Sequence, residues 1–453
     1  MEILIVAVFI LGYAAITLEH NLKIDKLVPA LLMMAIAWAI VALGLDGFEN
    51  WFDSHEGKLI DGFKDLPYMA EGHETVTKSS IFQNTLLHHF GKTCEILIFL
   101  IGAMTIVEII DYFDGFSTIK KFIKTNKKRT LLWIVSILAF ILSAIIDNLT
   151  ATIVLITILR KLIASKEDRM WFAGMIIITA NAGGAWSPIG DVTTTMLWMA
   201  HKVSALKLVE LLIIPSLVCM IIPTLIASYM KPFKGNFEPM EDDNLPNKYS
   251  APMLYIGLTL IVSVPVFKTV THLPPYIGMM LALGIFTVFA EAFSKRAFDI
   301  SHAGVDDHHS PVHKALTRIE MPSLLFFLGI LMTVAALESL GMIFQFGKSV
   351  EGSIGTDLFV VILGGASAIV DNVPLVAASM GMFPDLGMDH PTWHFIAYAA
   401  GTGGSMLIIG SAAGVVAMGM EKISFFWYLK NIALLALVGY LSGIGVLYLL
   451  ELA

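Results

Sequence analysis

The most informative feature of this sequence for its fold is Asn181-Ala-Gly-Gly-Ala-Trp-Ser-Pro-Ile-Gly-Asp191. It interrupts residues 170–200, an otherwise apolar run that is long enough to cross a bilayer, which takes about 20 helical residues. Glycine and proline together break helices. We therefore expect a discontinuous helix here, with its unwound centre at mid-membrane depth.

The composition places the chain in a membrane. It is 57% hydrophobic and only 15% charged, whereas soluble domains carry roughly 25% charged residues. The net charge of -8 is spread over loops, without the basic tract that nucleic-acid binding needs. Further apolar runs predict uninterrupted spans at 1–18, 27–45, 94–110, 207–230, 251–267, 275–293, 321–340 and 426–450.

A second interrupted stretch, residues 130–163, has polar residues at its centre and basic residues at both ends. Basic flanks indicate the cytoplasmic side, so both ends lie on one face and the stretch predicts a re-entrant hairpin. Its tip is Ile146-Asp147-Asn148-Leu149-Thr150. Non-helical backbone at this depth is tolerated only beside protein or a water-filled cavity, which makes the tip a candidate site. The acidic segment 46–92 then lies outside, and both termini are predicted outside.

The chain contains a weak internal repeat. Asp147-Asn148 recurs as Asp371-Asn372, and the break Asn181-Ala-Gly-Gly recurs as Gly401-Thr-Gly-Gly. The second hairpin, 355–390, has acidic flanks and enters from outside, so the halves are inverted, as in many transporters. We predict an all-α integral membrane fold, an inverted-repeat transporter with about ten crossings, two re-entrant hairpins and two discontinuous helices. The first repeat covers 1–230, the linker 231–250 and the second repeat 251–453.

Three carboxylates fall on the interrupted elements: Asp147, Asp191 and Asp371. An ionisable residue at mid-membrane costs several kcal/mol, so its presence indicates function. No Lys or Arg lies within 130–159, 170–201 or 358–420, and acids with oxygen donors suit a hard cation. A desolvated carboxyl group holds either a proton or a cation, which predicts cation/proton exchange.

Neutral oxygen donors lie at the same predicted depth as these acids. They are Asn148, Thr150, Thr152, Asn181, Ser187, Thr193, Asn372, Thr402, Ser405 and Ser411. Two alternatives stay open. Each acid can also cap the helix that follows it, and the pairs Gly183-Gly184 and Gly403-Gly404 serve either a close approach to an ion or tight helix packing.

One polar loop holds metal-ligand residue types outside these elements. The loop 294–318 carries His302, Asp306, Asp307, His308, His309 and His313. We interpret it as a solvated cytoplasmic loop. No cofactor is predicted, and both cysteines, Cys94 and Cys219, lie in or beside apolar runs.

The chain resembles the NhaD-type sodium/proton antiporters of the ion transporter superfamily over nearly its whole length. The motifs that carry the resemblance are Ser143-Ala-Ile-Ile-Asp-Asn-Leu-Thr-Ala-Thr152, Asn181-Ala-Gly-Gly-Ala-Trp-Ser-Pro-Ile-Gly-Asp-Val-Thr-Thr194, Glu320-Met-Pro-Ser-Leu-Leu-Phe-Phe327 and Asp371-Asn-Val-Pro-Leu-Val-Ala377. The resemblance implies a multi-pass protein of the bacterial inner membrane that exports Na⁺ or Li⁺ in exchange for protons.

The resemblance also implies roles for individual residues and for domains. Asp147, Asp191, Asp371 and Asn372 carry the ion and proton work, with Ser405 and Ser411 supporting them. It implies a homodimer with an elevator-type mechanism, in which 1–45 and 251–293 form the scaffold. The hairpins and broken helices of 94–230 and 321–453 form the mobile part.

Two other functions fit parts of this pattern. An arsenite or dicarboxylate carrier of the same superfamily would share the fold, but three central acids disfavour an anionic cargo. An intramembrane aspartyl protease needs a Gly-x-Gly-Asp motif, and Ile189-Gly190-Asp191 is preceded by Pro188 instead of glycine. We therefore predict a transporter and not an enzyme.

Overall fold

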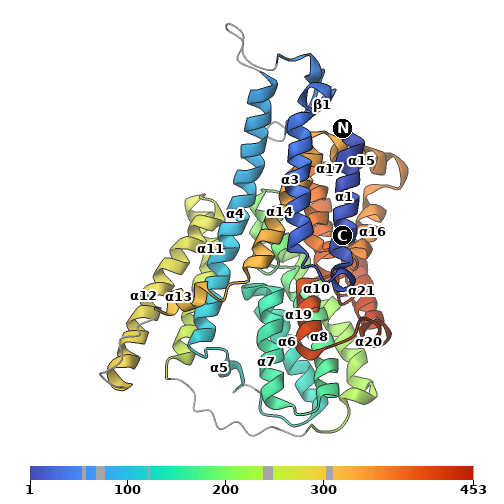
Figure 1. Ribbon diagram of the computed structural model, residues 1–453. Helices are drawn as coiled ribbons and strands as arrows, with labels where there is room; N and C mark the ends of the chain where they lie inside the picture. Colours follow the sequence, from blue (N-terminus) through green and yellow to red (C-terminus); the bar gives the residue numbers. More distant parts are fainter. Residues whose placement is uncertain (54–57, 68–76, 121–122, 238–247, 302–309, 452–453) are drawn as a thin grey trace. The chain divides into compact units, whose positions relative to one another are not determined.

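The computed structural model describes residues 1–53, 58–67, 77–120, 123–237, 248–301 and 310–451 (Figure 1). Helices make up nearly all of the regular structure in these ranges. The exception is an antiparallel pair, β1 (Asn50–Asp53) and β2 (Lys58–Asp61), in which Trp51 lies opposite Ile60. The sequence analysis did not predict this pair. The short elements are α2 (Glu19–Leu22), η1 (Leu45–Gly47), η2 (Phe63–Asp65), α5 (Ser117–Lys120), η3 (Lys231–Phe233) and α13 (Pro311–Leu316).

Seven helices of the described residues are long and apolar enough to cross a membrane, or up to eight if one bent pair counts as a span. The bent pair is α15 (Met342–Ser353) with α16 (Thr356–Ala366), at 119°. The seven are α4 (Lys78–Tyr112), α6 (Lys128–Ile146), α10 (Ala205–Tyr229), α11 (Ser250–Thr271), α12 (Pro275–Ser301), α14 (Met321–Ser339) and α21 (Ala433–Glu451). The predicted all-helical, multi-span membrane fold is confirmed, while the number of crossings stays a prediction.

The predicted span 94–110 is part of the 35-residue helix α4, which begins 16 residues earlier, at Lys78. Three further predicted spans also differ from the structure. Two are shorter apolar helices, α1 (Glu2–Thr17) and α3 (Leu27–Leu43). The run 426–450 is not uninterrupted, because Ile432 separates α20 (Phe425–Asn431) from α21. The side chain of Ile432 is fully buried against Gly174, where an added Cβ would lie 2.6 Å from it. Packing at this one position therefore outweighs the continuous apolar pattern.

The chain divides into two compact units. Unit 1 comprises Met1–Ile98, Glu320–Val360 and Val373–His390. In it α3 packs against α1 and α14, and the Trp38 indole donates a hydrogen bond to the Met332 carbonyl at 2.8 Å. Unit 2 comprises Phe99–Ile319, Val361–Asn372 and Pro391–Ala453. The predicted scaffold segments 1–45 and 251–293 fall in different units, and their assignment as scaffold stays a prediction.

Four helix breaks occur where the sequence analysis expected them. Asp147 separates α6 from α7 (Asn148–Leu162), and these two helices pack on each other as a hairpin. Residues 185–191 separate α8 (Lys166–Gly184) from α9 (Val192–Met199), and residues 404–411 separate α18 (Pro391–Gly403) from α19 (Ala412–Glu421). The fourth break lies between α16 and α17 (Asn372–Met382).

The two discontinuous helices form the centre of unit 2. Every residue of α8 from Trp171 to Gly184 is buried, and so is every residue of α18 from Thr392 to Gly403. A helix that is apolar on all sides belongs inside a protein. Half of the predicted linker 231–250 lies outside the described residues, at 238–247, and so does the histidine-rich part of the predicted loop 294–318, at 302–309. The described part of that loop is largely helical instead, because α12 extends to Ser301 and α13 includes His313.

Candidate functional site

Asp147 marks the tip of the first hairpin. Its backbone leaves the helix at φ 75° and ψ 160°, and its side chain caps α7. One carboxylate oxygen accepts the Thr150 backbone N–H at 2.8 Å, and the other accepts the Thr150 hydroxyl at 2.9 Å. Asp147 therefore does cap the helix that follows it, which was one of the two alternatives for this residue. Part of its carboxylate stays accessible.

Asp191 ends the break between α8 and α9 and is only 2% exposed. Its Oδ1 caps α9 by accepting the backbone N–H and the hydroxyl of Thr193, at 2.9 and 2.8 Å. Its Oδ2 accepts from the Asn148 amide at 2.6 Å. No Lys or Arg among the described residues forms an ion pair with it, so its buried charge is stabilised by neutral donors alone.

A chain of amides connects Asp191 to the second broken helix. The Asn148 amide also donates to the Asn181 side-chain oxygen at 3.1 Å, and the Asn181 amide donates to the Ser411 hydroxyl at 3.0 Å. Ser411 caps α19. The Asn372 amide lies 3.5 Å from both oxygens of Asp191, at the limit of a hydrogen bond. Residues from both predicted repeats thus meet around one carboxylate.

Five predicted donors lie outside this cluster: Thr150 bonds to Asp147, the Thr152 hydroxyl has no partner among the described residues, and three others bond to backbone carbonyls. The Ser187 hydroxyl donates to the Ala144 carbonyl at 2.5 Å, the Thr402 hydroxyl to the Tyr398 carbonyl at 2.6 Å, and the Ser405 hydroxyl to the Thr402 carbonyl at 2.7 Å. Each side chain therefore holds backbone at a helix or a break. Asp371 lies at the end of the break before Asn372, directly next to the cluster in sequence.

A small cavity of about 20 Å³ is lined by Asp147 and Asp191 within unit 2. Apart from these two acids and Thr195, its lining is apolar. The apolar residues from outside the broken elements are Phe99, Leu100, Ala103 and Met104 of α4, Ile261 of α11 and Met279 of α12. The two acids therefore share one apolar chamber.

The comparisons with known proteins agree with this geometry. Residues 8–395 match the family model described as citrate transporter, CitMHS. Sodium/proton antiporter 1 of Arabidopsis thaliana is 39% identical over 98% of this chain and 72% of its own length. The Na⁺/H⁺ antiporter NhaD of Vibrio cholerae is 30% identical over 98% of this chain and 90% of its own length. The chain belongs to this family of sodium/proton antiporters.

Membership in the antiporter family confirms the resemblance to NhaD that the motifs predicted. A solved structure extends the likeness to the fold. The YdaH transporter of Alcanivorax borkumensis, whose topology is described as unusual, aligns with a TM-score of 0.56 over 93% of this chain and 97% of its own, at 12% identity. At that identity the likeness concerns the fold alone.

Sequence reasoning missed the wall of the cavity. Phe99, Ile261 and Met279 carry no chemical signal, because an apolar residue in an apolar helix reads as lipid-facing or as core. The only hint was Met104-Thr105, which recurs as Met332-Thr333 in the internal repeat. The predicted roles of the site residues themselves stay predictions.

Proposed function

We propose that this chain exchanges Na⁺ or Li⁺ for protons at the cluster around Asp191 and Asp147. One observation carries the proposal: Asp191 is 2% exposed, and its hydrogen-bond donors among the described residues are neutral, Asn148 and Thr193 foremost. A buried carboxylate without a cationic side chain requires a proton or a bound cation to neutralise it. Binding of one displaces the other, and this competition is an exchange.

The surroundings supply oxygen ligands for a hard cation. Thr152 follows Asn148 by one helical turn on the same face of α7. It is fully buried, and its hydroxyl has no hydrogen-bond partner among the described residues. Carboxylate, amide and hydroxyl oxygens are the ligands that hard cations prefer. The relatives' names, sodium/proton antiporter and Na⁺/H⁺ antiporter, point to the same cargo.

The direct test uses the purified protein in proteoliposomes with an imposed pH gradient. Addition of Na⁺ or Li⁺ outside should dissipate the gradient, whereas a chloride salt of a large organic cation should not. Asp191→Asn should lose this response. Glu210→Gln, which removes one partner of an exposed ion pair on α10, is the control and should keep it. A gradient that no alkali cation dissipates at any pH from neutral to alkaline would refute the proposal.

A second cargo class follows from the family description, which is citrate transporter. Citrate is an anion, and no Lys or Arg lies within 130–159, 170–201 or 358–420, the parts of the broken elements near the acids, to receive it. Uptake of labelled citrate into the same proteoliposomes tests this alternative directly. Uptake that Asp191→Asn leaves unchanged would favour an anion route elsewhere in the chain.

We further propose that transport proceeds by an elevator-type movement in a homodimer, with two inverted repeats supplying the two hairpins. Repeated local contacts within unit 2 support the duplication. The Ser143 hydroxyl donates to the Ala180 carbonyl at 2.6 Å, and the Ser367 hydroxyl donates to the Ala400 carbonyl at 2.8 Å. Each contact joins a hairpin to the discontinuous helix of its own half: Ser143 lies in α6, and Ser367 directly follows α16.

A further inference from the structure

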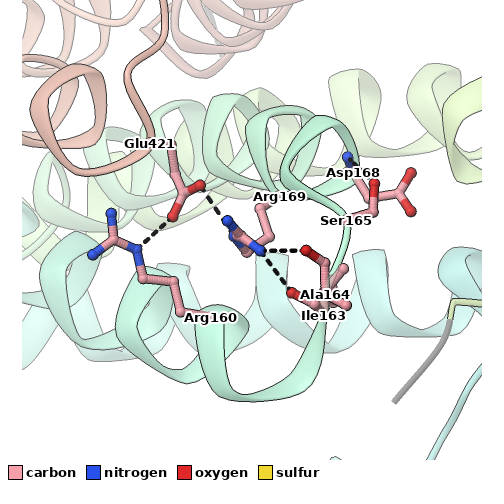
Figure 2. A network of polar contacts seen from close by, with 7 residues as sticks. All are labelled: Arg160, Ile163, Ala164, Ser165, Asp168, Arg169 and Glu421. Carbon is pink, nitrogen blue, oxygen red and sulfur yellow. Dashed lines mark hydrogen bonds and ion pairs between the residues drawn. The ribbon is translucent and has the colours of Figure 1, made fainter. Parts of the chain in front are cut away.

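Glu421, the last residue of α19, is a buried carboxylate. It lies at the opposite end of this helix from Ser411, which belongs to the amide cluster of Asn148, Asn181, Asn372 and Ser411 around Asp191. It is 1% exposed and forms two ion pairs. Its Oε1 accepts from Arg160 Nε at 2.7 Å, and its Oε2 accepts from Arg169 Nε at 3.1 Å (Figure 2). Arg160 lies in the last turn of α7, and Arg169 lies in the first turn of α8.

Arg169 also fixes the connection between α7 and α8. Its Nη1 donates to the carbonyls of Ile163 and Ala164, both at 2.8 Å (Figure 2). The next residue, Ser165, caps α8 by accepting the Asp168 backbone N–H. One carboxylate therefore joins the end of α19 to the turn between two other helices.

The same three helices carry the amide cluster at their opposite ends. Asn148 begins α7, Asn181 lies in the last turn of α8, and Ser411 caps α19. At 1.5 Å per residue, Asn148 lies about 18 Å from Arg160, Asn181 about 18 Å from Arg169 and Ser411 about 15 Å from Glu421. The three helices are thus tied by polar contacts at both ends, over nearly equal lengths.

Packing alone specifies the position of α19 poorly. It lies against α7 and α8, but its sequence is Ala412-Ala-Gly-Val-Val-Ala-Met-Gly-Met-Glu421, which is rich in small side chains. Small residues allow close approach of helices but provide few side chains that interlock. The rotation and height of α19 therefore depend on its two polar ends, Ser411 and Glu421.

We infer that Glu421 is a positioning residue for the cation site: its ion pairs with Arg160 and Arg169 hold α19 in register with α7 and α8, so that Ser411, Asn181 and Asn148 stay aligned. The inference rests on the proposed function for its meaning in transport. Outer partners that orient ligands change metal affinity by about 10- to 100-fold when they are removed. Glu421 touches no transported ion itself.

The first test compares Na⁺ and Li⁺ exchange by reconstituted wild type and Glu421→Gln. The variant keeps the side-chain shape and removes the ion pairs. We expect the KM for both cations to rise about 10- to 100-fold while the maximal rate changes less. Asp168→Asn is the matched control. Asp168 lies in the same turn of α8 as Arg169, and the substitution breaks its 2.6 Å ion pair with Lys128 of α6, which does not involve α19. It should leave KM unchanged.

A fallback variant covers the case in which Glu421→Gln does not reach the membrane. Arg169→Lys retains the charge but loses the planar donor fork that serves Glu421 and the two carbonyls together, and it should also raise KM. An unchanged KM, or a lower maximal rate at constant KM, in the variant that folds would overturn the inference.

A second measurement does not depend on the cargo and keeps the inference separable from the proposed function. Thermal unfolding in detergent is compared for wild type, Glu421→Gln, Ser411→Ala and the double variant. Since both residues hold one helix, the double variant should lose less Tm than the sum of the single losses. Strictly additive losses would overturn the inference even if no cation were transported. A non-additive result without any cation response would instead refute only the proposed function.

Discussion

The backbone of Asp147 has a conformation that residues with a Cβ atom rarely adopt. At φ 75° and ψ 160° it lies in a region populated essentially by glycine, which costs about 1–3 kcal/mol for other residues. Strain of this size persists where the surrounding structure enforces it, and it gathers at functional sites. Here a glycine would relieve the strain but would remove both the cap on Thr150 and the carboxylate in the cavity.

Two substitutions at this position separate strain from function. Asp147→Gly and Asp147→Ala both lose the cap and the carboxylate, but only alanine keeps a Cβ in the strained conformation. We expect the glycine variant to be more stable than the alanine variant by about 1–3 kcal/mol, with exchange absent in both. Thermal unfolding of the purified variants shows which of the two is more stable. An alanine variant at least as stable as the glycine variant would show that the backbone is unstrained.

The two possible roles of Asp191, helix cap and ion ligand, can be separated by one isosteric change. Asparagine caps helices about as well as aspartate, so Asp191→Asn preserves the start of α9 through Thr193. We expect the variant to reach the membrane at the wild-type level with exchange reduced to background. Exchange by Asp191→Asn at the wild-type rate would assign this residue to capping alone. Immunoblots of membranes and the proteoliposome assay supply the two readouts.

At the scale of elements, the breaks were predictable because their causes are local. Glycine, proline and a capping acid within a few residues identify the end of α8. Glycines and the capping Ser411 identify the break after α18, and the polar pair Asp147-Asn148 in an apolar run identifies the end of α6. The amide cluster was partly predictable for the same reason, since Asn148, Asn181 and Ser411 lie at those breaks. The Glu421 ion pairs were not, because they join residues more than 250 positions apart in the sequence. No spacing rule links such partners.

The glycine pairs at the breaks are explained by packing. An added Cβ at Gly183 would fall within contact distance of the Phe140 backbone, and one at Gly403 would meet the Gly364 backbone. We expect Gly183→Ala and Gly403→Ala to lose most of the folded protein, because backbone cannot move aside as a side chain can.

The matched control for these glycine variants lies on α19. Gly419 has nothing within 4 Å of an added Cβ, and alanine favours a helix by about 1 kcal/mol over glycine. Gly419→Ala should therefore fold as well as wild type or better. Fluorescence-detected size-exclusion chromatography measures the yield of folded protein for all three variants. Wild-type yields for Gly183→Ala would imply that α6 and α8 approach each other less closely.

At the scale of the whole molecule, exchange requires that the proton and the cation be alternatives at one place. Both acids of the cavity lie in unit 2, in a chamber with apolar walls. A charged carboxylate without a partner is costly in such surroundings. In the mechanism proposed above, the empty, doubly charged site is therefore the state least suited to movement across the membrane, and the loaded states are better suited. Coupling then follows from neutralisation and needs no separate gate.

Competition at one place has a defined dependence on pH. When the pH falls, protons occupy the acids more often, so a higher cation concentration is needed to displace them. We expect the apparent KM for Na⁺ to rise by up to about tenfold for each unit that the pH falls while the acids are mostly protonated, with the maximal rate at saturating Na⁺ unchanged. The measurement is the initial rate of sodium-dependent proton release from proteoliposomes across a series of pH values. A maximal rate that changes with pH at constant KM would locate the proton at a separate regulatory group, and the shared-site mechanism would then be wrong.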